Sequence, residues 1–211
     1  MESGYMDLIH TSINSKGSGT YQATVLSKRI FFEEHPEAKK QFHIHLIDSK
    51  TYKYGLWDIP VVEGVQMVQE GASVDEIIEH IQEWLEHARP VFVPRNLKCV
   101  KKSGRISPAA AFMGDAIGLK PLITFEDGEA KVISKARGEH KAIATLLDRC
   151  MKERCPDTNY VLIYGSNQDA FAELKKACAE VMDRPPMSEY KAGCIISINT
   201  GPNMVGILYR T

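Results

Sequence analysis

The sequence lacks every cysteine arrangement that would mark a metal knuckle or a redox motif. Its five cysteines stand apart and form no Cys-x-x-Cys pair, and the close pair Cys150 and Cys155 has a spacing that fits neither function. An odd number of scattered cysteines indicates a reducing compartment, and small buried apolar side chains are the simplest role for them. The five are Cys99, Cys150, Cys155, Cys178 and Cys194.

Long apolar runs and a surplus of positive charge are also missing. No stretch approaches the length of a membrane span, and Met1–Tyr5 does not join a basic region to an apolar core as a signal peptide does. The formal net charge is −1, so no overall field attracts nucleic acid. We therefore expect a cytoplasmic protein without a nucleic-acid partner, for which any membrane contact is local and transient.

What the chain does contain is the composition of an ordinary globular protein. Its 211 residues, 44% of them hydrophobic and 25% charged, suffice for one large domain or two small ones. An apolar run over Leu8–Ile13 is followed by a helical pattern with Ala23, Leu26 and Ile30 on one face, and then by a second apolar run over Phe42–Ile47. Strand, helix and strand in this order predict a βαβ unit with parallel strands.

A pair of helices and a domain boundary come next. Apolar residues recur at helical spacing over Trp57–Gln69. Ser73 and Glu76 have the spacing of a capping box, which opens a further helix with an apolar stripe. Arg89–Pro90 ends this helix and marks the boundary between the two parts of the chain.

The second part alternates strands and helices. The dipeptide Asp127–Gly128 is a strong turn signal between two apolar runs and predicts a β-hairpin. The turn at 199–203 joins two closing strands. We expect strands over 91–93, 122–125, 130–133, 160–164, 195–198 and 205–209, and helices over 97–102, 109–117, 140–154 and 168–182.

Three polar or basic segments adjoin apolar runs, and they are the most informative feature of the chain. They are Ile13–Gln22, Leu46–Lys50 and Lys101–Ser107. Hydroxyls and free backbone N–H groups brought together in this way are the chemistry of an anion site. None of the segments supplies a convincing base, nucleophile or metal cage. The pattern predicts a protein that holds an anionic ligand without transforming it, and that needs no cofactor or metal.

The same segments resemble the signatures of the DegV family of bacterial fatty-acid-binding proteins. The family's Ser-Ser-x-x-Ser-Gly-Thr-Tyr-Gln motif corresponds to Asn14–Gln22, and its next strand end corresponds to Ile47–Lys50. Three further matches follow in order: Leu97–Ile106 with the family's basic Gly-Gly-Arg-Ile stretch, Leu119–Leu122 with its Ile-Lys-Pro-Ile, and Thr200–Pro202 with its His-Thr-Gly-Pro-Gly.

The resemblance implies a two-lobe α/β architecture, the DegV-like or EDD fold. Residues 1–88 would form a partial lobe with a parallel sheet, and residues 89–211 an α/β lobe with a mixed sheet. Relatives usually have additional residues before the Ser-Gly-Thr signature, among them a threonine that helps to hold the ligand's carboxylate. We therefore expect a truncated N-terminal lobe that exposes an apolar edge or face, and a homo-oligomer as the consequence.

The ligand site implied by the resemblance lies between the lobes, with the acyl tail in an apolar slot and the carboxylate at the strand ends. Carried over to this sequence, the binding residues are Asn14, Ser15, Arg105, Asn199 and Thr200. Two of them depart from the family's pattern, because Asn14 stands in place of a serine and Asn199 in place of a histidine. Asparagine can donate a hydrogen bond, but it cannot carry a positive charge.

Simpler structural roles remain open for several of these residues. Ser18 or Thr20 could cap a helix, which would leave the carboxylate to Ser15. His43 and His45 alternate on a strand and point to one face, yet no third metal ligand lies at a helpful spacing. Asp48 is explained by capping at the end of a strand.

The function implied by the resemblance is that of a non-catalytic carrier. It would bind a long-chain fatty acid and present it to a separate fatty acid kinase of the dihydroxyacetone-kinase type. Two alternatives stay open: an enzyme that acts on a small phosphorylated or carboxylated metabolite, with Arg105 and the Ser/Gly loop as its anion clamp, and a fragment that binds no ligand.

Overall fold

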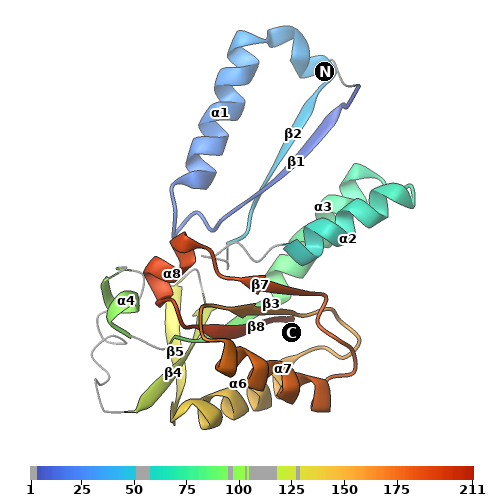
Figure 1. Ribbon diagram of the computed structural model, residues 1–211. Coiled ribbons are helices and arrows are strands. Elements are labelled where there is room, and N and C mark those ends of the chain that lie inside the picture. Colours follow the sequence, from blue (N-terminus) through green and yellow to red (C-terminus); the bar gives the residue numbers. More distant parts are fainter. Residues whose placement is uncertain (1–3, 51–57, 95–96, 103, 105–117, 127–128) are drawn as a thin grey trace. The chain divides into compact units, whose positions relative to one another are not determined.

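The structure is a computed structural model that describes residues 4–50, 58–94, 97–102, 104, 118–126 and 129–211. The chain divides into two compact units, Met1–Glu86 and His87–Thr211 (Figure 1). Each unit has its own sheet and is described by itself. The chain passes from one to the other directly, because helix α3 (Val74–His87) is followed at once by strand β3 (Ala88–Val93). Pro90 therefore lies within a strand instead of ending the helix.

The N-terminal unit begins with the predicted βαβ arrangement, which the structure confirms. Strand β1 (Asp7–Ser12), helix α1 (Thr20–Glu34) and strand β2 (His43–Asp48) follow one another. The strands are parallel, and the register runs from Asp7 opposite His43 to Ser12 opposite Asp48. Helix α1 ends before Pro36, as expected, and the 3₁₀ helix η1 (Pro36–Lys40) leads into β2. Among the described residues the sheet has these two strands alone.

Helix α1 buries little of its surface. None of its residues is buried. Leu26 and Ile30, predicted to share one face of the helix, are exposed in 46% and 41% of their surface. A sheet of two strands is too narrow to cover the whole apolar face of a helix that lies along it. The sequence pattern is thus correct for a helix, but the surface that would bury it is absent from the described part of this unit.

Helices α2 (Asp58–Gln69) and α3 complete the N-terminal unit. The predicted capping box is present: Ser73 Oγ accepts the N–H of Glu76 at 3.3 Å, and the Ser73 N–H donates to Glu76 Oε2 at 2.7 Å. The two helices approach closely because Gly64 has no side chain. A Cβ at this position would lie 3.1 Å from Ile77 Cγ2. Helix α3 is strongly amphipathic, with Ile77, Ile81, Trp84 and Leu85 buried.

The described residues of the C-terminal unit form a mixed sheet of six strands in the order β5-β4-β3-β8-β6-β7. All neighbouring strands are antiparallel except β6 and β7, which are parallel. Besides β3, the strands are β4 (Leu119–Glu126), β5 (Glu129–Arg137), β6 (Val161–Tyr164), β7 (Ser188–Lys191) and β8 (Val205–Arg210). The predicted hairpin is confirmed as β4 and β5, although its turn at 127–128 lies outside the described residues.

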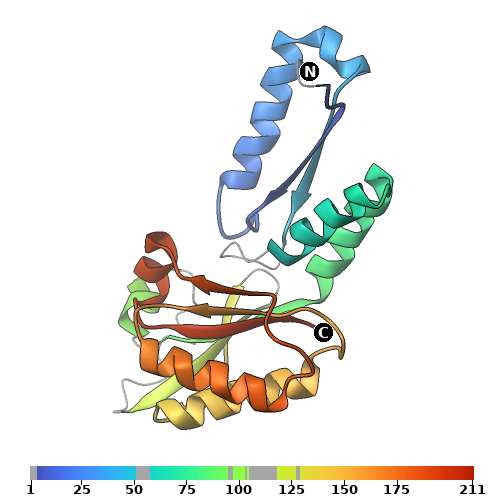
Figure 2. The ribbon, with the colours of Figure 1, turned by 45° about the vertical axis from the view of Figure 1, so that its right-hand side comes forward.

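Two long helices, α6 (Glu139–Glu153) and α7 (Gln168–Val181), pack against one face of this sheet (Figures 1 and 2). They bury a continuous apolar core, in which Leu146, Leu162 and Leu174 are completely inaccessible. The opposite side chains of the strands are buried as well, and Phe92 stacks on Phe125 with ring centroids 5.8 Å apart. Side chains on both faces of this sheet are therefore buried, whereas helix α1 of the N-terminal unit buries none of its residues.

Two elements of the C-terminal unit differ from the sequence-based expectation. Strand β7 was not predicted, since Ser188–Lys191 is short and polar and lies at the edge of the sheet. Residues 195–198 were predicted as a strand but form part of helix α8 (Cys194–Thr200). The β-branched residues of this segment favour a strand. In the helix, the side chains of Asn199 and Thr200 donate hydrogen bonds to the carbonyl oxygens of Ile195 and Ile196. The predicted helix 109–117 lies outside the described residues, and helix α4 (Leu97–Lys102) agrees with its prediction.

Candidate functional site

The polar turn after β1 forms a closed network of hydrogen bonds. Asn14 is fully buried; its Oδ1 accepts the N–H of Lys16 at 2.9 Å, and its carbonyl oxygen accepts the N–H groups of Gly17 and Ser18. From the end of β2, Asp48 Oδ1 accepts the N–H groups of Ser15 and Lys50, each at 3.0 Å. The parallel pairing of β1 and β2 places their carboxyl ends side by side, which makes this contact between the two turns possible.

This network changes the expectation for the site. The sequence indicated a cradle of free backbone N–H groups, but those of four consecutive residues, Ser15 to Ser18, all donate within the protein. A carboxylate bound here would therefore depend on side chains. The role of Asp48 agrees with the simpler structural interpretation, since its carboxylate caps the turn after β1 as well as its own strand end.

The hydroxyl groups of the turn are not equivalent. Ser18 Oγ and Thr20 Oγ1 lie 2.8 Å apart and bond to each other. Neither residue is the N-cap of α1, which is Gly19 without a side-chain cap, so the capping prediction for Ser18 and Thr20 is wrong. Ser15 is half-buried, and within the described part of the chain its hydroxyl makes no hydrogen bond. Ser15 is thus the serine of this turn with a hydroxyl left for a ligand.

A groove of about 740 Å³ lies beside β2, within the N-terminal unit. We call it the β2 groove. Its apolar wall comes from three elements: Val25 and Phe32 on α1, Ile44 and Ile47 on β2, and Ile78 on α3. Basic side chains also line it. Lys28 Nζ donates to the carbonyl oxygen of Ile44 at 2.6 Å, and Arg29 and Lys39 complete the basic set.

A smaller pocket of about 270 Å³ continues the β2 groove toward the carboxyl end of β2. The two share four lining residues: Tyr21, Leu46, Ile47 and Gln82. The smaller pocket adds the strand-end group Asp48, Ser49 and Lys50. Apolar side chains therefore line β2 up to a strand-end pocket that contains polar, basic and acidic groups, with Glu86 and Asp48 as its acidic residues. The β2 groove and the strand-end pocket together have a volume typical of small-molecule sites.

Asn199 and Thr200 lie in the C-terminal unit, at the end of α8, so they do not share a unit with Asn14 and Ser15. Both are buried. Asn199 Nδ2 donates to the carbonyl oxygen of Ile195 at 2.8 Å, and Thr200 Oγ1 donates to that of Ile196 at 2.9 Å. These hydrogen bonds stabilise the short helix. To bind a ligand, Asn199 Nδ2 and Thr200 Oγ1 would have to give up these hydrogen bonds or donate to the ligand as well.

Arg105 lies outside the described residues. Of its basic neighbours on α4, Lys101 is half-buried and Lys102 exposed. His45 Nε2 lies 2.8 Å from Asp7 Oδ1, which ties β2 to β1 and gives this histidine a structural role. No group of three or more possible metal ligands occurs among the residues that the structure describes. No helix in that part of the chain is both long and apolar enough to cross a membrane.

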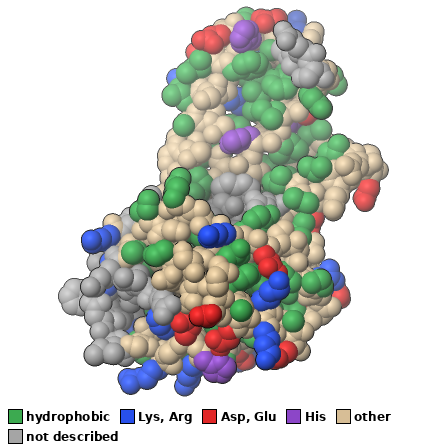
Figure 3. Space-filling view, viewed as in Figure 1, with side chains coloured by type: hydrophobic (Ala, Val, Ile, Leu, Met, Phe, Trp, Pro, Cys, Tyr) green, Lys and Arg blue, Asp and Glu red, His purple; other side chains and the backbone are tan. Residues whose placement is uncertain are grey.

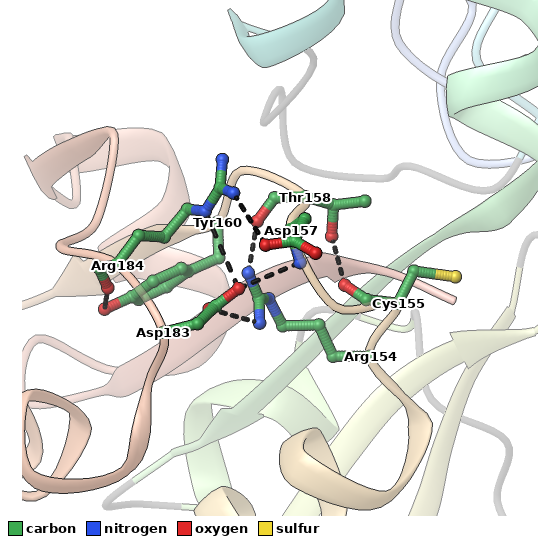
Figure 4. A network of polar contacts seen from close by, with 7 residues as sticks. All are labelled: Arg154, Cys155, Asp157, Thr158, Tyr160, Asp183 and Arg184. Atoms are coloured by element: carbon green, nitrogen blue, oxygen red, sulfur yellow. Dashed lines mark hydrogen bonds and ion pairs between the residues drawn. The ribbon is translucent and has the colours of Figure 1, made fainter.

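A connected polar cluster outside the candidate site lies in the C-terminal unit (Figure 4). Arg154 is its centre: Nη1 lies 2.8 Å from Asp183 Oδ1, Nη2 donates to the Thr158 carbonyl, and the guanidinium lies over the Tyr160 ring. The pKa of Asp183 is lowered by the hydrogen bond from the Asp157 N–H and by Arg154. The cluster ties the end of α6 to the loop after α7, so it is structural.

Comparison with known proteins identifies the family. The model described as an uncharacterised protein of the DegV family matches residues 1–211. A DegV domain-containing protein of Clostridium perfringens is 31% identical over 206 residues, which are 96% of this chain and 70% of that protein. One of Caldanaerobacter subterraneus subsp. tengcongensis is 30% identical, over 94% of this chain and 68% of that protein.

Solved structures have the same fold. A DegV family protein of Eubacterium eligens loaded with heptadecanoic acid has a TM-score of 0.85 at 21% identity, over all of this chain and 75% of that one. The fatty acid kinase (Fak) B3 protein of Streptococcus pneumoniae, loaded with linoleic acid, has a TM-score of 0.85 at 22% identity, over 98% of this chain and 72% of that one. The predicted α/β fold of DegV type is thereby confirmed.

Proposed function

Because the chain belongs to the DegV family, we propose that it binds a long-chain fatty acid, with the tail in the β2 groove of the N-terminal unit. The single observation that carries this proposal is the continuity of the groove with the strand-end pocket. Its apolar walls match an acyl tail. Ser49 and Lys50 line the polar end, and Ser15 is tied to that end by the hydrogen bond from its N–H to Asp48. The solved DegV structures loaded with heptadecanoic or linoleic acid support this class of ligand.

The energetics favour a tail in this position. Each methylene group removed from water contributes about 0.8 kcal/mol, so a long acyl chain supplies most of the binding free energy. The carboxylate then needs only a few donors to be oriented. The Ser15 hydroxyl is one such donor, and a hydrogen bond to a charged group is worth about 1.5–3 kcal/mol.

A pair of serine variants tests the carboxylate end. Ser15→Ala should weaken the affinity for a fluorescent fatty acid by roughly ten- to a hundredfold, since about 1.4 kcal/mol corresponds to tenfold. Ser18→Ala is the matched control, because the Ser18 hydroxyl is already bonded to Thr20, and its affinity should stay within about twofold of wild type. Equal affinities for wild type and Ser15→Ala would contradict the assignment of Ser15.

A pair of valine variants tests the tail. Val25 lines the β2 groove, whereas Val68 on α2 is exposed and does not. Val25→Lys places a charge where the acyl chain would lie and should lower the affinity at least about tenfold, because burying a charge against hydrocarbon is unfavourable. Val68→Lys should leave it unchanged. Mass spectrometry of an organic extract of the purified protein should also find a long-chain acid. If Val25→Lys binds the fatty acid as well as wild type does, and no long-chain acid is found in the extract, the proposal is wrong.

A carrier needs a recipient for its ligand. We infer that this chain presents the fatty acid to a separate kinase of the dihydroxyacetone-kinase type and is not itself the catalyst. The name of the structurally similar Streptococcus pneumoniae protein, fatty acid kinase B3 protein, supports this role. Adding such a kinase and ATP to the loaded protein should yield an acyl phosphate, and the protein with ATP alone should yield none.

Loading also requires exchange with a lipid source, for which α8 offers a surface. Ile195 and Ile198 lie on this helix with 72% and 73% of their surface exposed, whereas its polar residues Asn199 and Thr200 are buried. Exposed apolar groups of this kind mark interaction sites. We therefore propose transient membrane contact through α8. Ile195→Glu/Ile198→Glu should slow fatty-acid transfer from vesicles, and Met151→Glu on α6, another exposed apolar residue, should not.

A further inference from the structure

The β2 groove has a direction, because it follows α1 from one end to the other. The α1 residues that line it recur at helical spacing and so form one face of the helix. They are Tyr21, Val25, Lys28, Arg29, Phe32 and Glu33. Tyr21 also lines the strand-end pocket, so Glu33 marks the opposite end of the groove. At a rise of about 1.5 Å per residue, the helix from Tyr21 to Glu33 is about 18 Å long.

The end of the groove at Glu33, which we call the far end, is lined by charged side chains. Arg29, Glu33 and Lys39 lie there. The Lys28 ammonium joins them, because it donates at 2.6 Å to the carbonyl oxygen of Ile44, which lines the groove but not the strand-end pocket. Three basic residues against one acidic residue leave an excess of positive charge at the far end.

Lys28 is the best placed of the basic residues. It is half-buried, and the Ile44 carbonyl is its one hydrogen-bond partner in the described part of the chain. The N–H groups of His43 and Ser49 donate to β1, so the backbone groups of Ile44 point away from β1, and Lys28 lies on the outer side of β2. An ammonium group has three N–H donors, so two of them remain for a ligand.

The methyl end of a simple fatty acid does not use these charges. With the carboxylate held near Ser15, the tail runs along the apolar wall and its methyl group reaches toward the far end. An apolar group beside an ammonium displaces water without replacing its hydrogen bonds. Figure 3 shows both features on the N-terminal unit: hydrophobic side chains gather on its surface, and charged side chains lie at the end where α1 finishes. The far end therefore suits an anionic group better than a methyl group.

We propose that the far end of the β2 groove is a second anion site, and that the ligand it selects is a long acyl chain with an anionic group at each end, such as a long-chain dicarboxylic acid. The inference rests on the proposed function, in which the first carboxylate is held near Ser15. The second carboxylate accepts hydrogen bonds from Lys28 and Lys39. Arg29 turns toward the same group, since its exposed ion pair with Glu33 at 3.6 Å contributes little.

A comparison of two acids of equal chain length tests the second site. Calorimetric titration of the purified chain, freed of lipid, should show that hexadecanedioic acid binds about three- to tenfold more tightly than hexadecanoic acid, as expected for one partly exposed charge interaction. An end that accepts only a methyl group would reverse this order, because the second carboxylate would lose water without gaining a partner. Octanedioic acid is too short to span the groove and should show no such gain over octanoic acid.

The outcomes separate this inference from the function on which it rests. If hexadecanoic acid binds and hexadecanedioic acid binds no more tightly, the second anion site is wrong and the proposed function stands. If neither acid binds, both are wrong.

Variants of the basic residues locate the site. Lys39→Gln and Lys28→Met should each reduce the gain for hexadecanedioic acid, and the double variant should bind the two acids within about twofold of each other. Lys28→Met keeps the apolar stem of the side chain in place. Lys40→Gln is the matched control, because Lys40 is exposed on the same 3₁₀ helix as Lys39 and does not line the groove. A gain that persists in the double variant, or that is lost in Lys40→Gln, contradicts the assignment.

Discussion

The two units of this chain use the same kinds of element and reach opposite degrees of burial. In the C-terminal unit, α6 and α7 pack on a six-stranded sheet and enclose a core of fully buried leucines. In the N-terminal unit, the equally long α1 lies by a sheet of which the structure describes two strands, and it buries no residue. The difference lies in the area of sheet that each helix can cover. It leaves apolar side chains of the N-terminal unit exposed, among them Leu26 and Ile30.

The largest effect is expected from truncating a leucine in each unit. Leu174→Ala in α7 removes a completely buried side chain and should lower the free energy of unfolding of the C-terminal unit by about 2–5 kcal/mol. Leu26→Ala in α1 removes a side chain that is half exposed and should cost less than about 1 kcal/mol. Urea unfolding followed by circular dichroism measures both. Equal losses would mean that α1 is packed as well as α7.

A second contrast comes from glycines at close contacts. In the C-terminal unit, a Cβ at Gly206 would lie 2.8 Å from the Val91 carbonyl oxygen, so Gly206→Ala should destabilise by about 1–3 kcal/mol. In the N-terminal unit, Gly64 meets only side-chain atoms of Ile77 and Ile81. Alanine is favoured over glycine within a helix by about 0.8–1 kcal/mol, which should offset the tighter contact. Thermal melts should show a clear loss for the first variant and little change for the second.

The cap of α3 gives a third, smaller effect. Ser73→Ala removes the acceptor for the Glu76 N–H and should destabilise the N-terminal unit by about 1 kcal/mol. Ser73→Asp keeps an acceptor at the N-cap and should retain most of the stability. Hydrogen exchange at the α3 amides separates the two variants. If Ser73→Ala leaves this exchange unchanged, packing on α2 and not the cap holds the start of the helix.

Acid sensitivity gives the smallest effect and concerns the C-terminal unit. The folded-state pKa of Asp183 is depressed by the Asp157 N–H and by Arg154. A carboxyl with a depressed pKa contributes stability above its unfolded pKa, and this contribution is lost as the pH falls through the folded value. Stability should therefore decline below about pH 4, and Asp183→Asn should be less stable at neutral pH and show a shallower decline. A decline of the same slope in Asp183→Asn would exclude Asp183 as a source.

Much of the fold follows from local patterns. The βαβ start, the capping box at Ser73 and the β4–β5 hairpin were predictable because each rests on residues close in sequence. The candidate site followed less completely. Ser15 was identified from its motif. Three of the four N–H groups of the turn, those of Lys16, Gly17 and Ser18, donate to the neighbouring Asn14. The use of the Ser15 N–H could not be foreseen, because it donates to the carboxylate of Asp48, 33 residues away.

Residues 195–198 show where local preference fails. Their β-branched side chains favour a strand, yet they belong to α8, where the side chains of Asn199 and Thr200 donate to carbonyl groups one turn earlier. The helix turns Ile195 and Ile198 outward. Local preference alone gives no account of this, because the environment of each face is set by elements far away in the sequence.

The sequence by itself determined most of the helices and strands, though not β7 or α8, and which family the chain belongs to, because periodicity, caps and motifs are local properties. Only the tertiary structure decided how much of each helix is buried and which hydrogen-bond donors remain for a ligand. These properties depend on pairing between distant segments, where a hydrogen-bonding group or apolar surface is either satisfied or left exposed.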